Sequence, residues 1–394
     1  MNAPVRAESL SLEAQIAPMF AEPGHENWAP MATMVAQKWM ARSRASLAAA
    51  LTRAGEAALG DALSPEWTPR FSAWRPEFAI AERAAQQGHA ALALLQFALA
   101  CDPGSTDLRL SATCPEEACL YVDGSLIRVH GNCTLHIRAG EFSLVSDSGA
   151  HCFRLHGHRW TRDVADSLPG WACEPSAATA PRNLIRAALP SSQGVFPWPE
   201  QRTLLGIALG RCEPARELPD SAAVQAALLR LAQRAPGYAD WVAGAIDTLV
   251  LLHGEDSSSA DFPGLVVLAA PTDALDACES LVSQAARQYL SRLASIVPLI
   301  QPGSEEIHYL PERRSYVTTR HLLAQAHEKA NVIAMLGMLE TDCAATRRRR
   351  ALRRMQFGVE LAGLLDVADS LTEGGRALWH QLRSLAASAL LDVR

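Results

Sequence analysis

The sequence predicts an α+β protein that is mainly helical. Aromatic residues make up only 6% of the 394 residues while alanine and leucine are abundant, a composition that favours helix packing over sheet sandwiches. Apolar residues recur at three- and four-residue spacing along most of the chain, and strict alternation is confined to its middle. We therefore expect a helical N-terminal region over 1–104, a β-rich region with a proline-rich linker over 105–200, and a helical domain over 201–394.

The composition is that of a globular protein with no general affinity for nucleic acid or membrane. The chain is 49% hydrophobic and 20% charged, and its formal net charge is −6. No run approaches the ~18 apolar residues that a membrane-spanning helix needs. Residues 1–8 lack the pattern of a signal peptide, and the nine cysteines are odd in number and scattered. We expect reduced thiols and a cytoplasmic location.

The N-terminal region is predicted to hold two helical segments. The first covers residues 8–60, after which two prolines over 64–69 interrupt the pattern. The second runs from about Pro76 to Leu99 and stops at Asp-Pro-Gly over 102–104.

Alternating runs then predict a small antiparallel sheet. The runs 119–122 and 126–129 flank Asp123-Gly124, which is typical of a hairpin turn. Further strands are expected at 134–137, 142–145 and 152–155, and residues 163–200 are expected to be rich in loops.

Helices are expected again from residue 221. The candidates are 221–234, 238–253, 273–294, 318–341 and 345–371. Between them, the apolar run 265–268 is bounded by Pro263-Gly264 and Pro271, which predicts a short buried strand.

The helix over 273–293 has two well-separated faces. Asp273 suits the N-cap position. The expected buried stripe consists of Leu275, Cys278, Val282, Ala285, Tyr289 and Leu293. The expected polar stripe consists of Asp276, Ser280, Ser283, Arg287 and Ser291. Ser283 and Arg287 are one turn apart and project to the same side.

This helix and its flanking segments resemble the HEXXH-motif family of peptide-modification proteins, which occurs with ribosomally made, post-translationally modified peptides. Ser283 stands where the family has its first His, Gln284 where it has Glu, and Arg287 where it has the second His. The resemblance covers residues 235–340 and is carried by the segments 238–243, 257–259, 262–266, 279–290, 297–303, 305–306, 309–311 and 322–332. It implies descent from metal-dependent enzymes, some of which resemble iron and 2-oxoglutarate hydroxylases of precursor peptides.

The three replacements argue against metal chemistry on this helix. Two His residues at i and i+4 grip one metal, and the Glu between them acts as a base. A serine hydroxyl is a poor ligand, glutamine has no carboxylate, and arginine is a permanent cation that repels a metal ion. We therefore expect no cofactor here. The resemblance places a further family ligand near His327 or Lys329, and the sequence leaves that register open.

Two further pairs are candidates for the same site. Arg313 and Arg314 lie where the family resemblance implies a site arginine, so they would bind the carboxylate of a cosubstrate or peptide, or else form a surface turn. His321 and His327 lie on the next predicted helix. Their six-residue spacing does not place both on one face, which favours packing or a polar contact over a shared metal.

Two other clusters have alternative interpretations. His151, His156 and His158, with Cys152, are the densest group of potential ligands, and they would form a zinc site or simply belong to the core. Arginines at 347–350, 353 and 354 would form a docking patch for an acidic peptide or another polyanion, or else a solvated helix face.

The expected function is a catalytically degenerate peptide-binding or scaffold partner of a separate modifying enzyme, with a precursor peptide as its ligand. The residues expected to hold the peptide are Ser283, Gln284, Arg287, Arg313, Arg314, His321 and His327. The alternative is a metal-dependent peptide oxygenase or hydroxylase that binds iron through relocated ligands. Those ligands would come from His151, His156, His158, His321 and His327. A third possibility is a structural subunit whose groove is closed.

Overall fold

The computed structural model groups segments that are far apart in the sequence into two compact units. One unit, the helical unit, combines Met1–Trp28, Val224–Val242 and Asp273–Arg394, and the other, the sheet unit, combines Ala29–Ala223 and Ala243–Thr272. These units differ from the three contiguous segments expected from the sequence. The structure describes residues 11–23, 28–55, 68–69, 76–102, 107–123, 125–138, 140–156, 159–162, 171–175, 183–187, 218–253, 257–258, 264–304, 307–310, 314–339 and 343–391.

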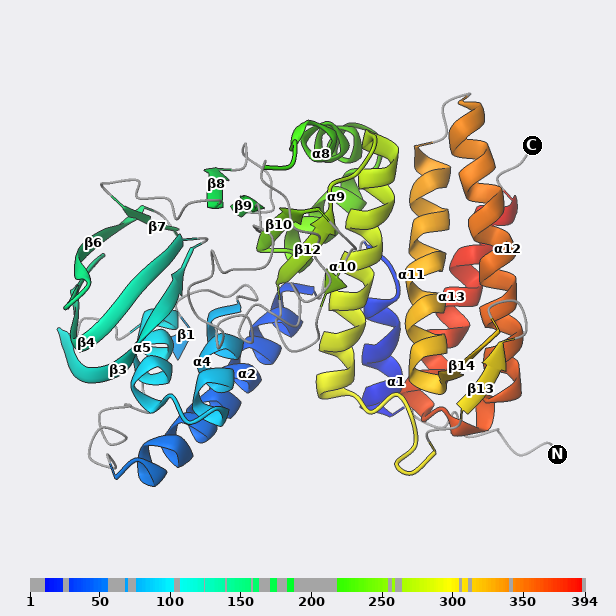
Figure 1. The fold of residues 1–394 in the computed structure, drawn as a ribbon. Helices are drawn as coiled ribbons and strands as arrows, with labels where there is room; N and C mark the ends of the chain where they lie inside the picture. Colours follow the sequence, from blue (N-terminus) through cyan, green and yellow to red (C-terminus); the bar gives the residue numbers. More distant parts are fainter. Residues whose placement is uncertain are drawn as a thin grey trace. The chain divides into compact units, whose positions relative to one another are not determined.

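The helical unit is an assembly of helices with one short hairpin (Figure 1). Its elements are α1 (Leu12–Ile16), η1 (Ala17–Phe20), α8 (Ala222–Arg234), α9 (Pro236–Ala245), α10 (Ala274–Ile296), β13 (Ile307–Leu310), β14 (Ser315–Thr318), α11 (Thr319–Met338), α12 (Ala344–Asp366), η2 (Ala368–Ser370) and α13 (Glu373–Leu391). The helix α11 is central, because α10, α12 and α13 all pack against it. Thr318 caps its start by accepting a hydrogen bond from the backbone of His321.

Several predicted helices are confirmed, and others needed correction. The helices expected at 221–234, 273–294 and 318–341 correspond to α8, α10 and α11. The helix expected at 345–371 ends at Asp366, and α13 was not expected. The helix expected at 238–253 was wrong in its second half, because α9 ends at Ala245 and β10 (Thr248–Leu252) follows it.

The sheet unit contains the predicted antiparallel sheet. Its five strands are β3 (Leu108–Val122), β4 (Ser125–Arg138), β5 (Glu141–Ser146), β6 (Gly149–His156) and β7 (Arg159–Arg162), paired in sequence order. The hairpin at Asp123 is confirmed, because Val122 pairs with Ser125 and Asp123 has φ +45°. The helices of this unit are α2 (Trp28–Arg53), α4 (Pro76–Gln86) and α5 (Ala90–Ala100). The single helix expected over 76–99 is divided at Gly88, which has φ +89°.

A second five-stranded sheet in the sheet unit was not expected. Its order is β11 (Ser257–Ser258), β12 (Leu265–Ala269), β10, β9 (Asn183–Ala187) and β8 (Trp171–Pro175). The strand predicted at 265–268 is confirmed as β12. The strand β10 is parallel to both β12 and β9 and is buried along its whole length. Strands buried on both faces are continuous apolar runs, which explains why β10 was mistaken for a helix. Likewise, β8 and β9 lie in the stretch expected to be loops.

Buried hydrogen bonds connect the elements of the sheet unit. The side-chain amide of Gln96 on α5 donates to the backbone oxygen of Tyr121 and accepts from its backbone nitrogen, both at 2.9 Å. The Tyr121 hydroxyl lies 2.5 Å from Oγ1 of Thr248, at the start of β10. Burial and nearby carboxylates raise the pKa of this hydroxyl well above 10, so it stays protonated and available as a donor. The two sheets therefore share a hydrogen-bonded core.

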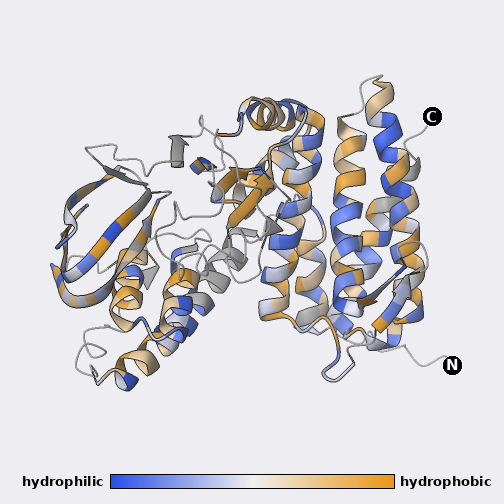
Figure 2. Ribbon diagram, viewed as in Figure 1, coloured by the Kyte–Doolittle hydropathy of each residue, from blue (hydrophilic) through white to orange (hydrophobic). Residues whose placement is uncertain are grey.

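The architecture confirms the predicted class, an α+β protein that is mainly helical. Hydrophobic residues line the inner faces of the helices and the buried strands (Figure 2). Among the described residues, no helix combines the length and apolar character needed to cross a bilayer.

Candidate functional site

The helix α10 has the two faces that the sequence predicts. The Asp273 carboxylate accepts hydrogen bonds from the backbone nitrogens of Leu275 and Asp276, both at 2.8 Å, and so caps the helix. The members of the predicted apolar stripe are all buried: Leu275, Cys278, Val282, Ala285, Tyr289 and Leu293. Tyr289 also stacks on Trp241 of α9 and donates its hydroxyl hydrogen to the Trp241 backbone oxygen at 3.0 Å.

The three motif positions differ in their surroundings. Ser283 is half-buried and Arg287 is exposed. Gln284 is only 1% exposed, and its buried Oε1 atom has no hydrogen-bond partner in the part of the chain that the structure describes. Gln284 is therefore not placed to contact a peptide on the surface. The expectation that Gln284 belongs to a peptide-binding site is corrected.

Arg287 connects α10 to α11. Its Nε donates to Oε2 of Glu328 at 2.8 Å, and the two side chains are 43% and 17% exposed. Glu328 follows His321 and Gln325 at helical spacing, so all three lie on one side of α11. The His321 ring Nε2 lies 2.5 Å from the Gln325 side-chain nitrogen. We call Arg287, His321, Gln325 and Glu328 the polar strip.

His327 lies in the core rather than on the polar strip. It is fully buried, and its Nε2 donates to the backbone oxygen of Phe20 at 2.7 Å. Burial lowers the pKa of His327 from 6.5 to about 4, so the imidazole is neutral at pH 7. Asn331, one turn later, donates to the backbone oxygen of Ala21 at 2.8 Å. The side chains of His327 and Asn331 thus hold the N-terminal segment onto α11. The expectation that His327 binds a peptide is therefore corrected.

Lys329 is also committed to the interior. Its ammonium group forms a buried ion pair with the Glu360 carboxylate of α12. The two side chains are 7% and 0% exposed. An ammonium group in an ion pair is no metal ligand, so Lys329 is not available as the further ligand that the resemblance suggested.

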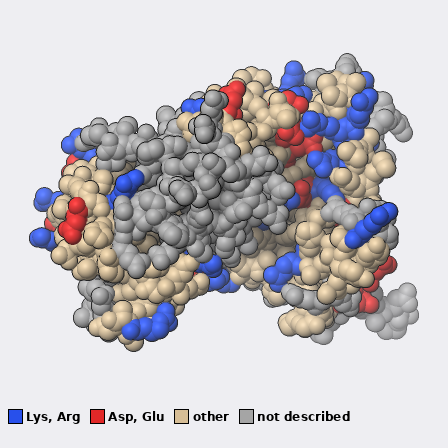
Figure 3. Space-filling model, in the orientation of Figure 1, with Lys and Arg blue, Asp and Glu red and all other residues tan. Residues whose placement is uncertain are grey.

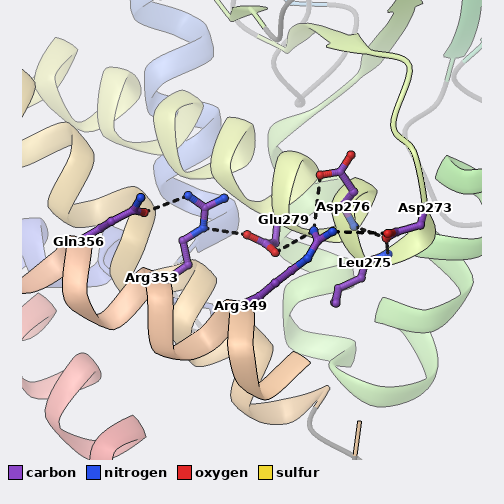
Figure 4. A network of polar contacts seen from close by, with 7 residues as sticks. All are labelled: Asp273, Leu275, Asp276, Glu279, Arg349, Arg353 and Gln356. Atoms are coloured by element: carbon purple, nitrogen blue, oxygen red, sulfur yellow. Dashed lines mark hydrogen bonds and ion pairs between the residues drawn. The ribbon is translucent and has the colours of Figure 1, made fainter. Parts of the chain in front are cut away.

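The acidic end of α10 and the arginine-rich part of α12 form a network of ion pairs (Figure 4). The Glu279 carboxylate, 4% exposed, accepts from Arg349 at 3.1 Å and from Arg353 at 2.8 Å. Arg349 also reaches Asp273 and Asp276 at 3.4 and 3.5 Å.

The arginine cluster is therefore neither wholly a docking patch nor wholly a solvated face. Arg349 and Arg353 bind α10, and Arg350 is buried, while Arg347 and Arg348 remain exposed. In Figure 3 basic and acidic side chains gather side by side over the N-terminal ends of α10 and α12.

The predicted arginine pair is only partly described. Arg313 lies outside the described residues. Arg314 is exposed in the turn before β14 and has φ +48°, a conformation that few residues other than glycine adopt. The position of Arg314 therefore agrees with the surface turn weighed for this pair.

The histidine cluster near residue 151 is also only partly described. His151 is half-buried on β6, opposite Leu144 of β5. His156 ends the same strand with a side chain outside the description, and His158 lies outside it altogether. In the described part of the chain no group of three or more His, Cys, Asp or Glu side chains is arranged to hold a metal ion.

The donor set on α10 does not fit the metal that the resemblance implies. A hydroxyl, a buried amide and a guanidinium bonded to a carboxylate supply neither an imidazole nor a free carboxylate. Comparison with known proteins adds no assignment, since no family model matches the chain and no curated protein matches it significantly.

Proposed function

We propose that the chain is a catalytically degenerate peptide-binding or scaffold partner of a separate modifying enzyme in a pathway for ribosomally made, post-translationally modified peptides. One observation carries the proposal. The position of the second family histidine holds Arg287, and that side chain is bonded to Glu328 rather than open to a metal. We also propose a cytoplasmic location, because the precursor peptides of such a pathway are made by ribosomes.

The polar strip supports a peptide as the ligand. Among the described residues, only Nε of Arg287 has a hydrogen-bond partner, and a guanidinium has five N–H donors in all. The remaining donors suit a peptide carboxylate or backbone oxygen. His321 and Gln325 add groups that donate or accept on the same side of α11. A surface with these groups holds an extended polar ligand through hydrogen bonds and charge.

Fluorescence anisotropy with labelled synthetic peptides would test the proposal. The peptides would be copied from short reading frames beside the gene. We expect one of them to bind with a dissociation constant of ~1 µM or lower. The double variant Arg287→Ala/Glu328→Ala removes both charges together, so it leaves no unpaired charge, and we expect it to weaken binding at least ~5-fold.

A matched control is the exposed pair Arg154 and Glu141 in the sheet unit, whose Nε and Oε1 are 3.1 Å apart. The variant Arg154→Ala/Glu141→Ala should bind peptide as the unmodified protein does. Failure of every neighbouring peptide to bind would contradict the function. Equal binding by both double variants would place the peptide elsewhere than the polar strip.

A further inference from the structure

The outer face of α12 carries apolar side chains that the helical unit leaves in water. Leu352, Met355 and Leu365 are 51%, 73% and 57% exposed. The opposite face is buried: Thr346, Arg350, Phe357, Glu360 and Leu364 pack inward. In Figure 2 the arginine-rich part of α12 is blue, and hydrophobic segments follow it. A helix whose inner face is already buried and whose outer face carries large apolar side chains has a second surface to cover.

Residues of this outer face follow a seven-residue repeat, in which Val359 is half-buried and the other members are exposed, while Leu365 lies beside it. Arg348, Leu352, Met355, Val359, Ala362 and Asp366 recur at alternating four- and three-residue steps, directly opposite Phe357. The repeat begins with a cation and ends with an anion, and its four inner members are apolar. Neither Arg348 nor Asp366 forms an ion pair with another residue that the structure describes.

This pattern is complementary to a second copy of itself that runs in the opposite direction. With a two-fold axis beside residue 357, Arg348 of one copy faces Asp366 of the other. Leu352 then faces Ala362, and Met355 faces Val359. Each contact occurs twice, as a two-fold interface requires. A parallel arrangement would instead bring Arg348 against Arg348 and Asp366 against Asp366, which repel.

Gly358 is consistent with a neighbouring helix on this side of α12. A glycine inside a helix costs about 1 kcal/mol relative to alanine. Among the described residues nothing requires it, because a Cβ atom built on Gly358 would have no atom within 4 Å. Gly358 lies about a quarter turn from the centre of the repeat, at the edge of the proposed interface, where a small residue leaves room for the neighbouring helix.

We propose that α12 is a homodimer interface, in which two copies of the chain pack their α12 helices antiparallel. The interface is one helix wide, so its area is at the low end for stable complexes, and a dissociation constant of ~1–50 µM is expected. This proposal is independent of peptide binding and of the polar strip.

Sedimentation equilibrium of the full chain over ~1–200 µM tests the proposal. We expect a reversible monomer–dimer equilibrium. Met355→Glu places two carboxylates at the centre of the interface and should raise the dissociation constant at least ~30-fold. The control Leu229→Glu alters another exposed side chain, on α8, which is 60% exposed. It should leave the dissociation constant of the dimer unchanged.

The charged ends give the most specific readout. Arg348→Asp and Asp366→Arg should each weaken the dimer ~10-fold, because each creates two like-charge pairs. The combined variant Arg348→Asp/Asp366→Arg should recover the original affinity, since both ion pairs are restored in reverse. Circular dichroism and urea unfolding would verify that each variant folds. A protein that stays monomeric throughout the concentration range would overturn the proposal, and so would a combined variant as weak as the single ones.

Discussion

Arg287 of α10 donates from Nε to Oε2 of Glu328 on α11 across 2.8 Å, at the position where the family that the chain resembles has a metal-binding histidine. The contact makes this position a link between two helices. A cation bonded to a carboxylate is a stable arrangement in itself and needs no metal for neutrality. If the proposed resemblance holds, arginine in place of histidine makes this position one for packing and polar contacts rather than for metal chemistry.

The Arg287–Glu328 pair should make a small contribution to stability. Arg287 is 43% exposed, so water and salt screen the attraction. A double-mutant cycle with Arg287→Ala and Glu328→Ala should give a coupling free energy of about 0.3–1 kcal/mol in urea unfolding. A coupling above ~3 kcal/mol would mean that the pair is a major structural contact, in the range of buried pairs, and would weaken its assignment to a ligand-binding surface.

The Lys329–Glu360 pair should behave differently because it is buried. Lys329→Met alone leaves the Glu360 carboxylate without its cation, and we expect a loss of about 3–5 kcal/mol in the free energy of unfolding. The double variant Lys329→Met/Glu360→Leu removes both charges and should recover most of that loss. Urea denaturation of both variants checks this. Equal losses in the single and double variants would show that the side chains contribute through shape rather than charge.

His327 should make stability depend on pH. Its pKa is lowered to about 4 in the folded chain, against 6.5 for the ordinary side chain, because the imidazole is buried. The unfolded chain therefore binds more protons between pH 6.5 and 4, and stability falls by about 1 kcal/mol per pH unit as the pH drops through this window.

The variant His327→Gln keeps a hydrogen-bond donor and does not titrate. The difference in unfolding free energy between this variant and the unmodified protein, measured from pH 7.5 to 4.5, isolates the effect of His327. A difference that stays constant with pH would contradict the buried, neutral imidazole.

Asp273 should stabilise the start of α10 in two ways. Hydrogen bonds from the backbone of Asp276 and Leu275, together with the nearby Arg349, lower the pKa of its carboxyl below 3.8. The ionised form is favoured by folding, so its contribution is present above pH 4 and is lost as the pH falls through the lowered pKa.

Asp273→Ala should cost ~1 kcal/mol at pH 7, as other N-cap replacements do. Asp273→Asn keeps the cap but not the charge, and should cost less. Thermal unfolding at pH 7 compares the two variants. An alanine variant as stable as the parent would show that α10 begins without help from this cap.

The sequence predicted α10 well because its signals are local. The cap at Asp273 and the apolar stripe ending at Leu293 both lie within the helix itself. The strand β10 was missed because a continuous apolar run has no periodicity to distinguish a buried strand from a helix. The hairpin at Asp123 was found because an Asp-Gly turn has its own chemistry.

The surroundings of the candidate site could not be predicted in the same way, because its partners are distant in sequence. His327 binds the backbone of Phe20, 307 positions away. Glu279 binds Arg353, 74 positions away. Leu323 and Ala330, at helical spacing from His327, were the available hint of its burial. The same spacing marked the Gln325 and Glu328 side of the polar strip.

Metal content tests the central claim most directly. The full-length, tag-free protein would be equilibrated with Fe(II) or Zn(II) under reducing, anaerobic conditions, desalted, and analysed by plasma mass spectrometry beside the variant Ser283→Ala/Arg287→Ala. We predict far less than one ion per chain, with no difference between the two proteins. One tightly held ion per chain that the variant loses would contradict the account, because it would return metal chemistry to α10.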